Sequence, residues 1–243
     1  MKALYLFFLL TAIPIVATAQ FWADAEAGVI TTGYNDVRIT GSGGTFFSLP
    51  DDLDGQTQVF YRLRAGYRFN GRSEVLVLFA PLQIGYEGRF AQDVTFKDIL
   101  FPMGRQVEGT YRFNSYRATY RYHLRSAERF DAALGLTIKV RDAVIALDDG
   151  VRRSERPDLG GVPLLHFHLH WKPSERFGVL LDGDALAVRS GRAEDVMLAL
   201  TYRPARPLML RAGYRLLEGG ADNRKVYTFS MFHYGLLGLT IYL

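Results

Sequence analysis

Apolar and polar side chains alternate along most of the chain with a period of two residues. In YRLRAGYRF (61–69), the odd positions are tyrosine, leucine, alanine and phenylalanine, whereas three of the four even positions are arginine. The stretches SYRATYRYHL (115–124) and FDAALGLTIKV (130–140) repeat this pattern. Successive side chains of a β-strand point to opposite faces of a sheet, so the alternation predicts strands with one apolar and one polar face.

The alternating segments predict an all-β chain of about ten strands, within a range of roughly eight to twelve. They span roughly 22–39, 57–69, 74–90, 108–124, 129–146, 162–172, 177–189, 194–204, 207–218 and 226–242. The third segment changes the parity of its apolar positions near Pro81. Because proline cannot donate to a β-ladder, this change predicts a β-bulge.

The connections between the strands alternate between long and short, beginning with a long one. The short connections span 70–72, 125–128, 173–176 and 204–206, and the longest span about 40–56, 91–107 and 147–161. Outer-membrane β-barrels show this asymmetry, with short periplasmic turns and longer external loops. The pattern therefore predicts a closed antiparallel transmembrane β-barrel whose long loops are external and whose two termini are periplasmic.

A soluble β-sandwich would show a similar alternation, with an exposed face rich in lysine, glutamate, serine and threonine. In this chain the polar face is sparse, rich in arginine and interrupted by glycine, which suits a confined lumen. The last segment alternates to its end, through Leu237, Leu239, Ile241 and Leu243. A barrel in hydrocarbon must close with its final strand, because an open edge would leave backbone amides unpaired. These features favour the barrel.

The segment 1–19 has the layout of a secretory signal peptide. Lys2 precedes an apolar run without charge, and Ala17 and Ala19 occupy the small-residue positions of a cleavage site. The alternative is a transmembrane anchor, but the run is short for a span of about 20 residues. We therefore predict a signal peptide at 1–19 and a single outer-membrane β-barrel domain at 20–243.

Composition narrows the function classes. The chain contains no cysteine, so no disulfide supports the fold. The 29 lysines and arginines nearly balance the 25 acidic residues, which gives little reason to expect a nucleic-acid partner. With 14% aromatic and 22% charged residues, the chain is too polar for a helical membrane protein and unusually aromatic for a secreted soluble domain.

The C-terminal stretch GLTIYL resembles the recognition signal of outer-membrane proteins, with Gly238, Ile241 and Leu243 at matching positions. It departs from that signal by ending in leucine rather than an aromatic residue, and by Leu236 where a polar residue is common. SEVLVLFAPLQI, LTIKVRDAVIAL, LLDGDALA, GRAEDV and AGYRLLEGGADNRKVYTF resemble a family of uncharacterised Gram-negative outer-membrane β-barrel proteins. The resemblance covers most of the mature chain. It implies fold and outer-membrane location, with no activity to carry over.

Three of the five histidines lie in VPLLHFHLHW, at His166, His168 and His170. The intervening Phe167 and Leu169 are apolar, so parity places the histidines on the lumen face. Histidines at alternate strand positions can chelate a transition metal, but no cysteine or acid within this strand completes a site. These histidines are therefore candidate metal ligands, and the simpler interpretation is that they fill a narrow lumen.

Folding three hairpins about their turns places three bases opposite three acids on the lumen side. The predicted pairs are Arg68 with Glu74, His123 with Asp131, and His166 with Asp182. Directly opposite Cβ atoms lie about 4.5–5.5 Å apart, within reach of an ion pair. Pairing is expected because an unpaired charge in a closed lumen is costly. A lumen path for protons or solutes built on His166 and Asp182 is the alternative.

The function predicted from the sequence is non-enzymatic and structural, with a lumen filled by charged side chains. The alternatives are a narrow pore for small solutes or ions, and an enzyme acting on lipid or peptide. Ser230 and His233 have an odd spacing, so on a regular strand they face opposite sides and do not form a catalytic pair. No cofactor is predicted. The expected partners are outer-membrane lipid, lipopolysaccharide and, during insertion, the barrel-assembly machinery.

Overall fold

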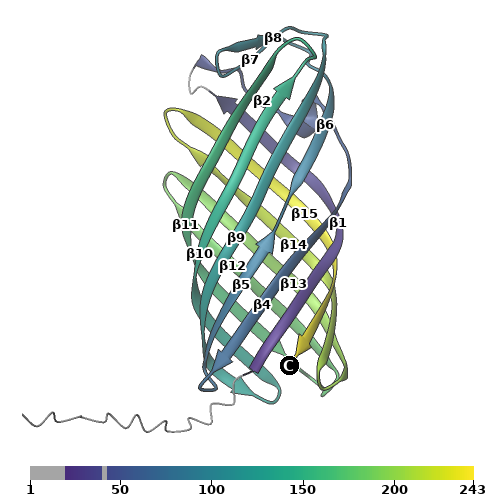
Figure 1. The fold of residues 1–243 in the computed structure, drawn as a ribbon, viewed down its shortest axis with the longest axis vertical. Coiled ribbons are helices and arrows are strands. Elements are labelled where there is room, and N and C mark those ends of the chain that lie inside the picture. Colours follow the sequence, from purple (N-terminus) through teal and green to yellow (C-terminus); the bar gives the residue numbers. More distant parts are fainter. Residues whose placement is uncertain (1–19, 40–42) are drawn as a thin grey trace, which may run out of the picture.

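The computed structural model describes residues 20–39 and 43–243, so the predicted signal peptide lies outside the described residues. Within the described part, ten antiparallel wall segments close into a barrel, as the alternation predicted (Figure 1). The wall strands are β1 (Gln20–Ile39), β4 (Gln58–Phe69), β5 (Ser73–Ala80), β6 (Gln83–Arg89), β9 (Gln106–Ala127), β10 (Phe130–Asp148), β11 (Arg153–Trp171), β12 (Phe177–Val188), β13 (Gly191–Ala205), β14 (Leu208–Asp222) and β15 (Val226–Tyr242). Strands β5 and β6 together form one wall segment.

The barrel closes where the last strand meets the first. Strand β15 pairs with β1 along the length of both, from Trp22 opposite Tyr242 to Ile39 opposite Val226. Strand β1 also pairs with β4, and β9 pairs with β10 on one side and with β5 and β6 on the other. Closure gives every wall strand a neighbouring strand on both sides over at least part of its length. The described residues contain no helix long and apolar enough to cross a membrane.

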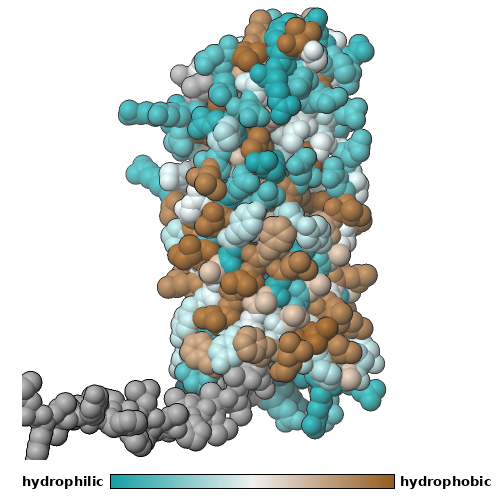
Figure 2. Space-filling model, viewed as in Figure 1, coloured by the Kyte–Doolittle hydropathy of each residue, from teal (hydrophilic) through white to brown (hydrophobic). Residues whose placement is uncertain are grey.

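The outer surface changes character along the barrel axis. Exposed apolar side chains surround the half that contains the chain's C-terminus, and hydrophilic side chains cover the opposite half (Figure 2). On β9, the outward positions are Tyr116, Tyr120 and Tyr122 in the first half, and Glu108 and Arg112 in the second. The first half therefore carries an apolar belt of the kind that faces hydrocarbon in outer-membrane barrels.

The polarity of the lumen-facing side chains changes in the opposite sense along the axis. Inside the apolar belt, β9 presents Arg117, Thr119 and Arg121 to the lumen, whereas beyond the belt it presents Val107 and Tyr111. The half beyond the belt therefore has a conventional hydrophobic core inside a polar surface, and the belt half has the reverse arrangement. The side chains follow their surroundings, since apolar groups turn toward lipid in one half and away from water in the other.

This inversion explains the parity change near Pro81, and the predicted β-bulge there is wrong. Strands β5 and β6 keep one register against β9, because Ala80 lies opposite Ser115 and Gln83 lies opposite Arg112. The inward face is unchanged across the break. What changes is its chemistry, from the buried carboxylate of Glu74 near the start of β5 to apolar side chains in β6.

The first two long connections fold onto the far end of the barrel. They contain β2 (Phe47–Ser48), α1 (Leu49–Asp52), β3 (Asp54–Gly55), β7 (Val94–Phe96) and β8 (Ile99–Phe101). Strand β2 pairs with β1, and β3 pairs with β6. The side chains of Leu49, Phe96 and Phe101 are fully buried and join the core cluster beneath them. These segments cap the barrel at this end.

The third long connection, expected at 147–161, is mostly strand. Strands β10 and β11 form a hairpin that stays paired until Asp148 lies opposite Arg153, with a turn at 149–152. The sequence Pro157 to Pro163 resembled a loop because it combines prolines with glycines. It forms a strand because only its β10 side is paired there, and proline is tolerated in an edge strand.

The belt can be tested with two leucines. Leu136 is 61% exposed within the belt, and Leu159 is 75% exposed beyond it, opposite Asp142 in the β10–β11 ladder. Leu136→Arg should lower the free energy of unfolding by ~2–4 kcal/mol if it lies near the bilayer midplane, whereas Leu159→Arg should have little effect. Urea unfolding in phospholipid vesicles measures both. Equal effects would contradict the assignment of the belt.

The orientation can be tested at two turns with open space around a left-handed glycine. Gly71 lies at the end that contains the C-terminus, and Gly150 lies at the tip of the β10–β11 hairpin. We predict that a protease added to intact cells cleaves a site inserted at Gly150 and spares the same site at Gly71, because the short turns of outer-membrane barrels are usually periplasmic. Cleavage at Gly71 alone would reverse the orientation.

Candidate functional site

The lumen inside the apolar belt is filled by ionised side chains from around the barrel. We call six of them the central network: Glu26 (β1), Arg62 (β4), Arg117 (β9), Asp184 (β12), Asp195 (β13) and Arg215 (β14). Each is at most 6% exposed. Three carboxylates face three guanidinium groups, so the charges within the network balance.

Arg215 is the most buried member, at 1% exposed. Its Nε and Nη2 atoms each donate to Glu26 at 2.9 Å, and its Nη1 donates to Asp195. Arg62 also donates to Asp195, at 2.9 Å. Charge-assisted, bidentate contacts of this kind are the strong hydrogen bonds of proteins, and they offset the cost of removing these charges from water.

Two acids of the network lie directly opposite each other in the wall. Asp184 on β12 is the register partner of Asp195 on β13. Like charges in such positions destabilise a sheet. Arg117 bridges them, because its Nη1 lies 2.7 Å from Asp184 and its Nη2 lies 2.6 Å from Asp195. Arg117 reaches them from β9, which is adjacent to neither strand in the wall.

The register of the β11–β12 hairpin differs by two residues from the prediction. His166 lies opposite Asp184 rather than Asp182, and Asp182 lies opposite His168. The turn is longer than expected, because β11 ends at Trp171 and β12 begins at Phe177. His166 Nδ1 lies 2.9 Å from Asp184, and its nearest approach to Asp182 is 3.9 Å.

The protonation of His166 follows from its two neighbours. Arg121 donates from Nε to His166 Nε2 at 3.0 Å, so Nε2 must accept. The Nδ1 atom then carries the proton and donates to Asp184. Arg121 also contacts Glu74 at 3.1 Å and Asp182 at 2.9 Å. His166 therefore links the central network to the charges nearer the short turns.

Of the other two predicted pairs, only Arg68 and Glu74 lie directly opposite each other in the strand register. Arg68 lies directly opposite Glu74, but the two side chains separate. Arg68 donates to the carbonyl of Gly71 at 2.9 Å and approaches Asp131 at 3.7 Å. Glu74 instead contacts His123 and Arg121, both at 3.1 Å.

His123 and Asp131 are not directly opposite, because a register irregularity at Ala132 and Ala133 displaces them. Their side chains still meet, with His123 Nδ1 2.7 Å from Asp131 Oδ1. The side chains of His123 and Asp131 compensate for the displaced register because they extend toward each other along the strands.

The three clustered histidines point to separate partners. His168 Nδ1 lies 2.8 Å from Asp182, and His170 Nε2 lies 3.0 Å from the hydroxyl of Thr201. Among the residues that the structure describes, no group of three or more histidine or acidic side chains is arranged to hold a metal ion. Each of these two contacts uses one of the two nitrogens of its ring.

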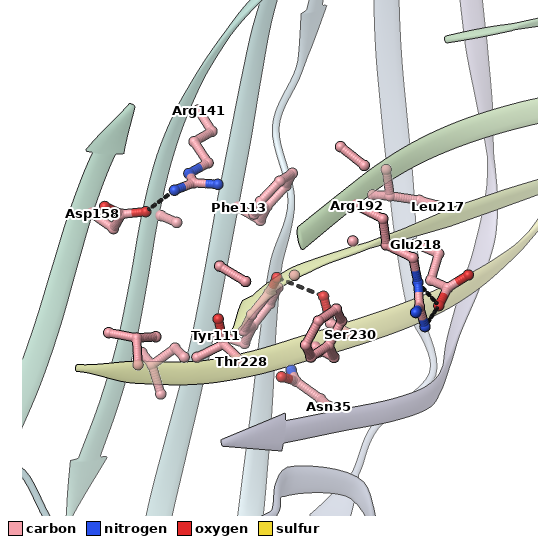
Figure 3. Close-up of a pocket in the computed structure, with 18 of the residues that line it drawn as sticks. Asn35, Tyr111, Phe113, Arg141, Asp158, Arg192, Leu217, Glu218, Thr228 and Ser230 are labelled. Atoms are coloured by element: carbon pink, nitrogen blue, oxygen red, sulfur yellow. Dashed lines mark hydrogen bonds and ion pairs between the residues drawn. The ribbon is translucent and has the colours of Figure 1, made fainter. Parts of the chain in front are cut away.

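Cavities lie on both sides of the central network. The larger one, about 500 Å³, reaches the short turns and is lined by Arg64, Arg68, His168, Lys172 and Arg206 among others. The smaller one, about 170 Å³, lies beyond the network among Tyr111, Phe113, Leu217 and Phe232 (Figure 3). We call it the upper pocket.

Ser230 lines the upper pocket and does not meet His233. Its hydroxyl lies 2.9 Å from that of Tyr111, inside the barrel (Figure 3). His233 is bonded through Nδ1 to the hydroxyl of Tyr214, which is exposed on the outer surface. The odd spacing thus places the serine and the histidine on opposite faces of β15.

Comparison with known proteins shows the fold. The sequence matches no protein-family model and no curated protein. The structure is similar to that of the outer-membrane protease OmpT from Escherichia coli, with a TM-score of 0.61, 7% identity, and coverage of 92% of this chain and 97% of OmpT. Ail of Yersinia pestis (TM-score 0.44, 12% identity, 92% and 99% coverage) and neisserial surface protein A (0.34, 16%, 91% and 96%) are also similar. The chain thus has the fold of Gram-negative outer-membrane β-barrels.

The observed register makes a specific energetic prediction. In a double-mutant cycle on the free energy of unfolding, His166→Gln should couple to Asp184→Asn by ~0.5–3 kcal/mol, because the two side chains share a buried hydrogen bond. The coupling of His166→Gln to Asp182→Asn should be smaller, given the 3.9 Å separation. A larger coupling of His166→Gln to Asp182→Asn than to Asp184→Asn would instead support the register predicted from the sequence.

Proposed function

We propose that this chain is a non-conducting, non-enzymatic protein of the Gram-negative outer membrane with a structural role and both termini in the periplasm. The apolar belt supports the location, because its outward side chains suit contact with outer-membrane lipid and lipopolysaccharide. The strictly alternating strand β15, which closes the barrel against β1, supports insertion by the barrel-assembly machinery.

The observation that carries the proposal is the central network. Its six members come from six strands spaced around the wall and meet in the middle of the lumen. A solute crossing the barrel would have to break several charge-assisted hydrogen bonds at once. The buried side chains of Phe96 and Phe101 obstruct the route again at the far end.

The two alternatives find less support. A pore requires a continuous path, and the spaces lined by residues of the central network itself are each only about 10 Å³, about the size of one water probe. A serine hydrolase requires a base within hydrogen-bond reach of the nucleophile. Ser230 contacts Tyr111 instead.

Conductance in planar bilayers tests the proposal. Purified wild-type protein should give no unitary current steps. A pore would conduct, and its current would change in the charge-balanced variant Glu26→Ser/Arg215→Ser, since any ion must pass these residues. Arg153→Ala, on the exposed tip of the β10–β11 hairpin, is the control for an unrelated loss of charge. Reproducible wild-type steps that respond to the network variant and not to the control would overturn the proposal.

A further inference from the structure

The barrel wall is incomplete on one side beyond the belt. Strand β11 pairs with β10 over its whole length but with β12 only from Trp171 to Leu165. Within the described part of the chain, residues 153–164 therefore pair with no strand on the β12 side, although Lys97 donates to the carbonyl of Glu155 at 2.9 Å. In Figure 1, β10 and β11 rise well above the light green connection between β12 and β13. We call the gap between residues 153–164 and this connection the notch.

The notch lies at the outer boundary of the apolar belt. Its lowest residues are in register with the exposed belt residues Ile138 and Val140, through Pro163 and Gly161 of β11. The next outward position of β10 is Asp142, which pairs with Arg112 at 3.0 Å on the barrel surface. A molecule at the surface of the external leaflet would therefore meet the notch.

The upper pocket lies behind the notch. Its lining includes Arg156 and Val162 from the unpaired part of β11, and Arg192 and Ala193 from the start of β13. These residues border the notch on its two sides, so the pocket extends to both edges of the notch. The central network separates it from the cavity at the short turns.

The pocket contains a buried amine that has no acidic partner among the described residues. Lys139 is only 4% exposed, lines the pocket, and has no ion pair or hydrogen bond to any described residue. Its ammonium group lies 4.6 Å from the ring centre of Phe113. A buried charge without a partner is costly, and a cation–π contact offsets only part of that cost. Lys139 is therefore suited to receive an anion.

Other side chains around Lys139 also favour an anionic ligand. Arg156, also in the lining, has no ion pair or hydrogen bond within the described part of the chain. The two other arginines of the pocket are neutralised, Arg141 by Asp158 and Arg192 by Glu218 (Figure 3). The pocket thus has two basic side chains, Lys139 and Arg156, without an acidic partner among the described residues.

The floor of the pocket is apolar. Phe232 and Leu217 are buried there, beside the ring of Phe113. The volume of about 170 Å³ is comparable with that of an apolar cavity, about 150 Å³, that binds benzene. An inorganic anion would satisfy the cations but leave the apolar walls in contact with water. A ligand with both an acidic group and an apolar body fits better.

We propose that the upper pocket binds an amphipathic carboxylate, entering through the notch, with its carboxylate on Lys139 and its apolar body against Phe113, Leu217 and Phe232. Such an acid could come from the external medium or from the external leaflet. The shared chemistry is a monoanion joined to a short alkyl chain or an aromatic ring. Binding requires neither conduction nor a particular structural role, so this proposal and the preceding one can fail separately.

Equilibrium dialysis with the barrel in zwitterionic nanodiscs tests the site, with protein-free nanodiscs subtracted. Octanoate should bind at least tenfold more tightly than octanol, which lacks the charge, and than acetate, which lacks the apolar body. Inorganic phosphate should not compete. Decanoate loaded into the nanodisc beforehand should displace octanoate if the acid arrives from the bilayer, and octanoate binding that only acids added to the medium displace indicates entry from the medium.

Variants assign the binding to the pocket. Lys139→Met keeps the length of the side chain and should weaken octanoate at least tenfold while leaving octanol unchanged. Lys172→Met, at the opposite cavity, is the matched control and should have no effect. Arg156→Gln, at the partly exposed edge of the pocket, provides a second variant should Lys139→Met fold poorly. Octanoate binding that persists in both pocket variants, or equal affinities for octanoate and octanol, would overturn the proposal.

Discussion

The structure depends on burying charge in the belt half of the lumen while giving each carboxylate and guanidinium a partner. The outer face of this half is committed to apolar side chains, so the alternation of the strands turns the remaining positions inward. Many of those positions are ionisable, and isolated buried charges would be unfavourable by several kcal/mol each. The apolar outer face therefore determines which positions point into the lumen. The charges at those positions are stabilised because arginines reach across the lumen to the acids. Arg117 illustrates this, since it neutralises two acids that the strand register places face to face.

Beyond the belt, the same strands follow the opposite rule. Outward positions there meet water and become polar, and the inward positions build an apolar core that the first two long connections cover. Without this core the far half would have no hydrophobic stabilisation of its own, because its outer face has no lipid to contact. The protein is thus a lipid-facing barrel continued by a water-facing one on shared strands.

The fold was predictable because alternation and connection lengths are local signals. The ten strands and the closing role of β15 were read from the sequence, and the structure confirms the closed barrel. Parity alone could not show that apolar residues change sides at Pro81, because it does not reveal what surrounds the strand. Nor could it show that the segment around Pro157 continues β11 as an unpaired edge.

The site was less predictable, because its contacts depend on register and on distance across the lumen. The β11–β12 hairpin is centred at residue 175 rather than 174, which moved the partner of His166 from Asp182 to Asp184, and no local pattern specifies this shift. The pairing of Arg215 with Glu26 joins strands on opposite sides of β15. Sequence parity placed these residues on the lumen face, but choosing partners among many such residues requires the closed geometry.

Lys139 lies at the height along the barrel axis where the outer surface changes from apolar to polar and the lumen changes from polar to apolar. Its strand neighbours Ile138 and Val140 are exposed belt residues, and inside the barrel it lies between the central network and the ring of Phe113. The acids of the network already accept from arginines, so pairing one with Lys139 would weaken another buried contact. The amine therefore remains at the edge of the apolar pocket, where an acidic group to pair with it and hydrophobic contact favour the same kind of ligand.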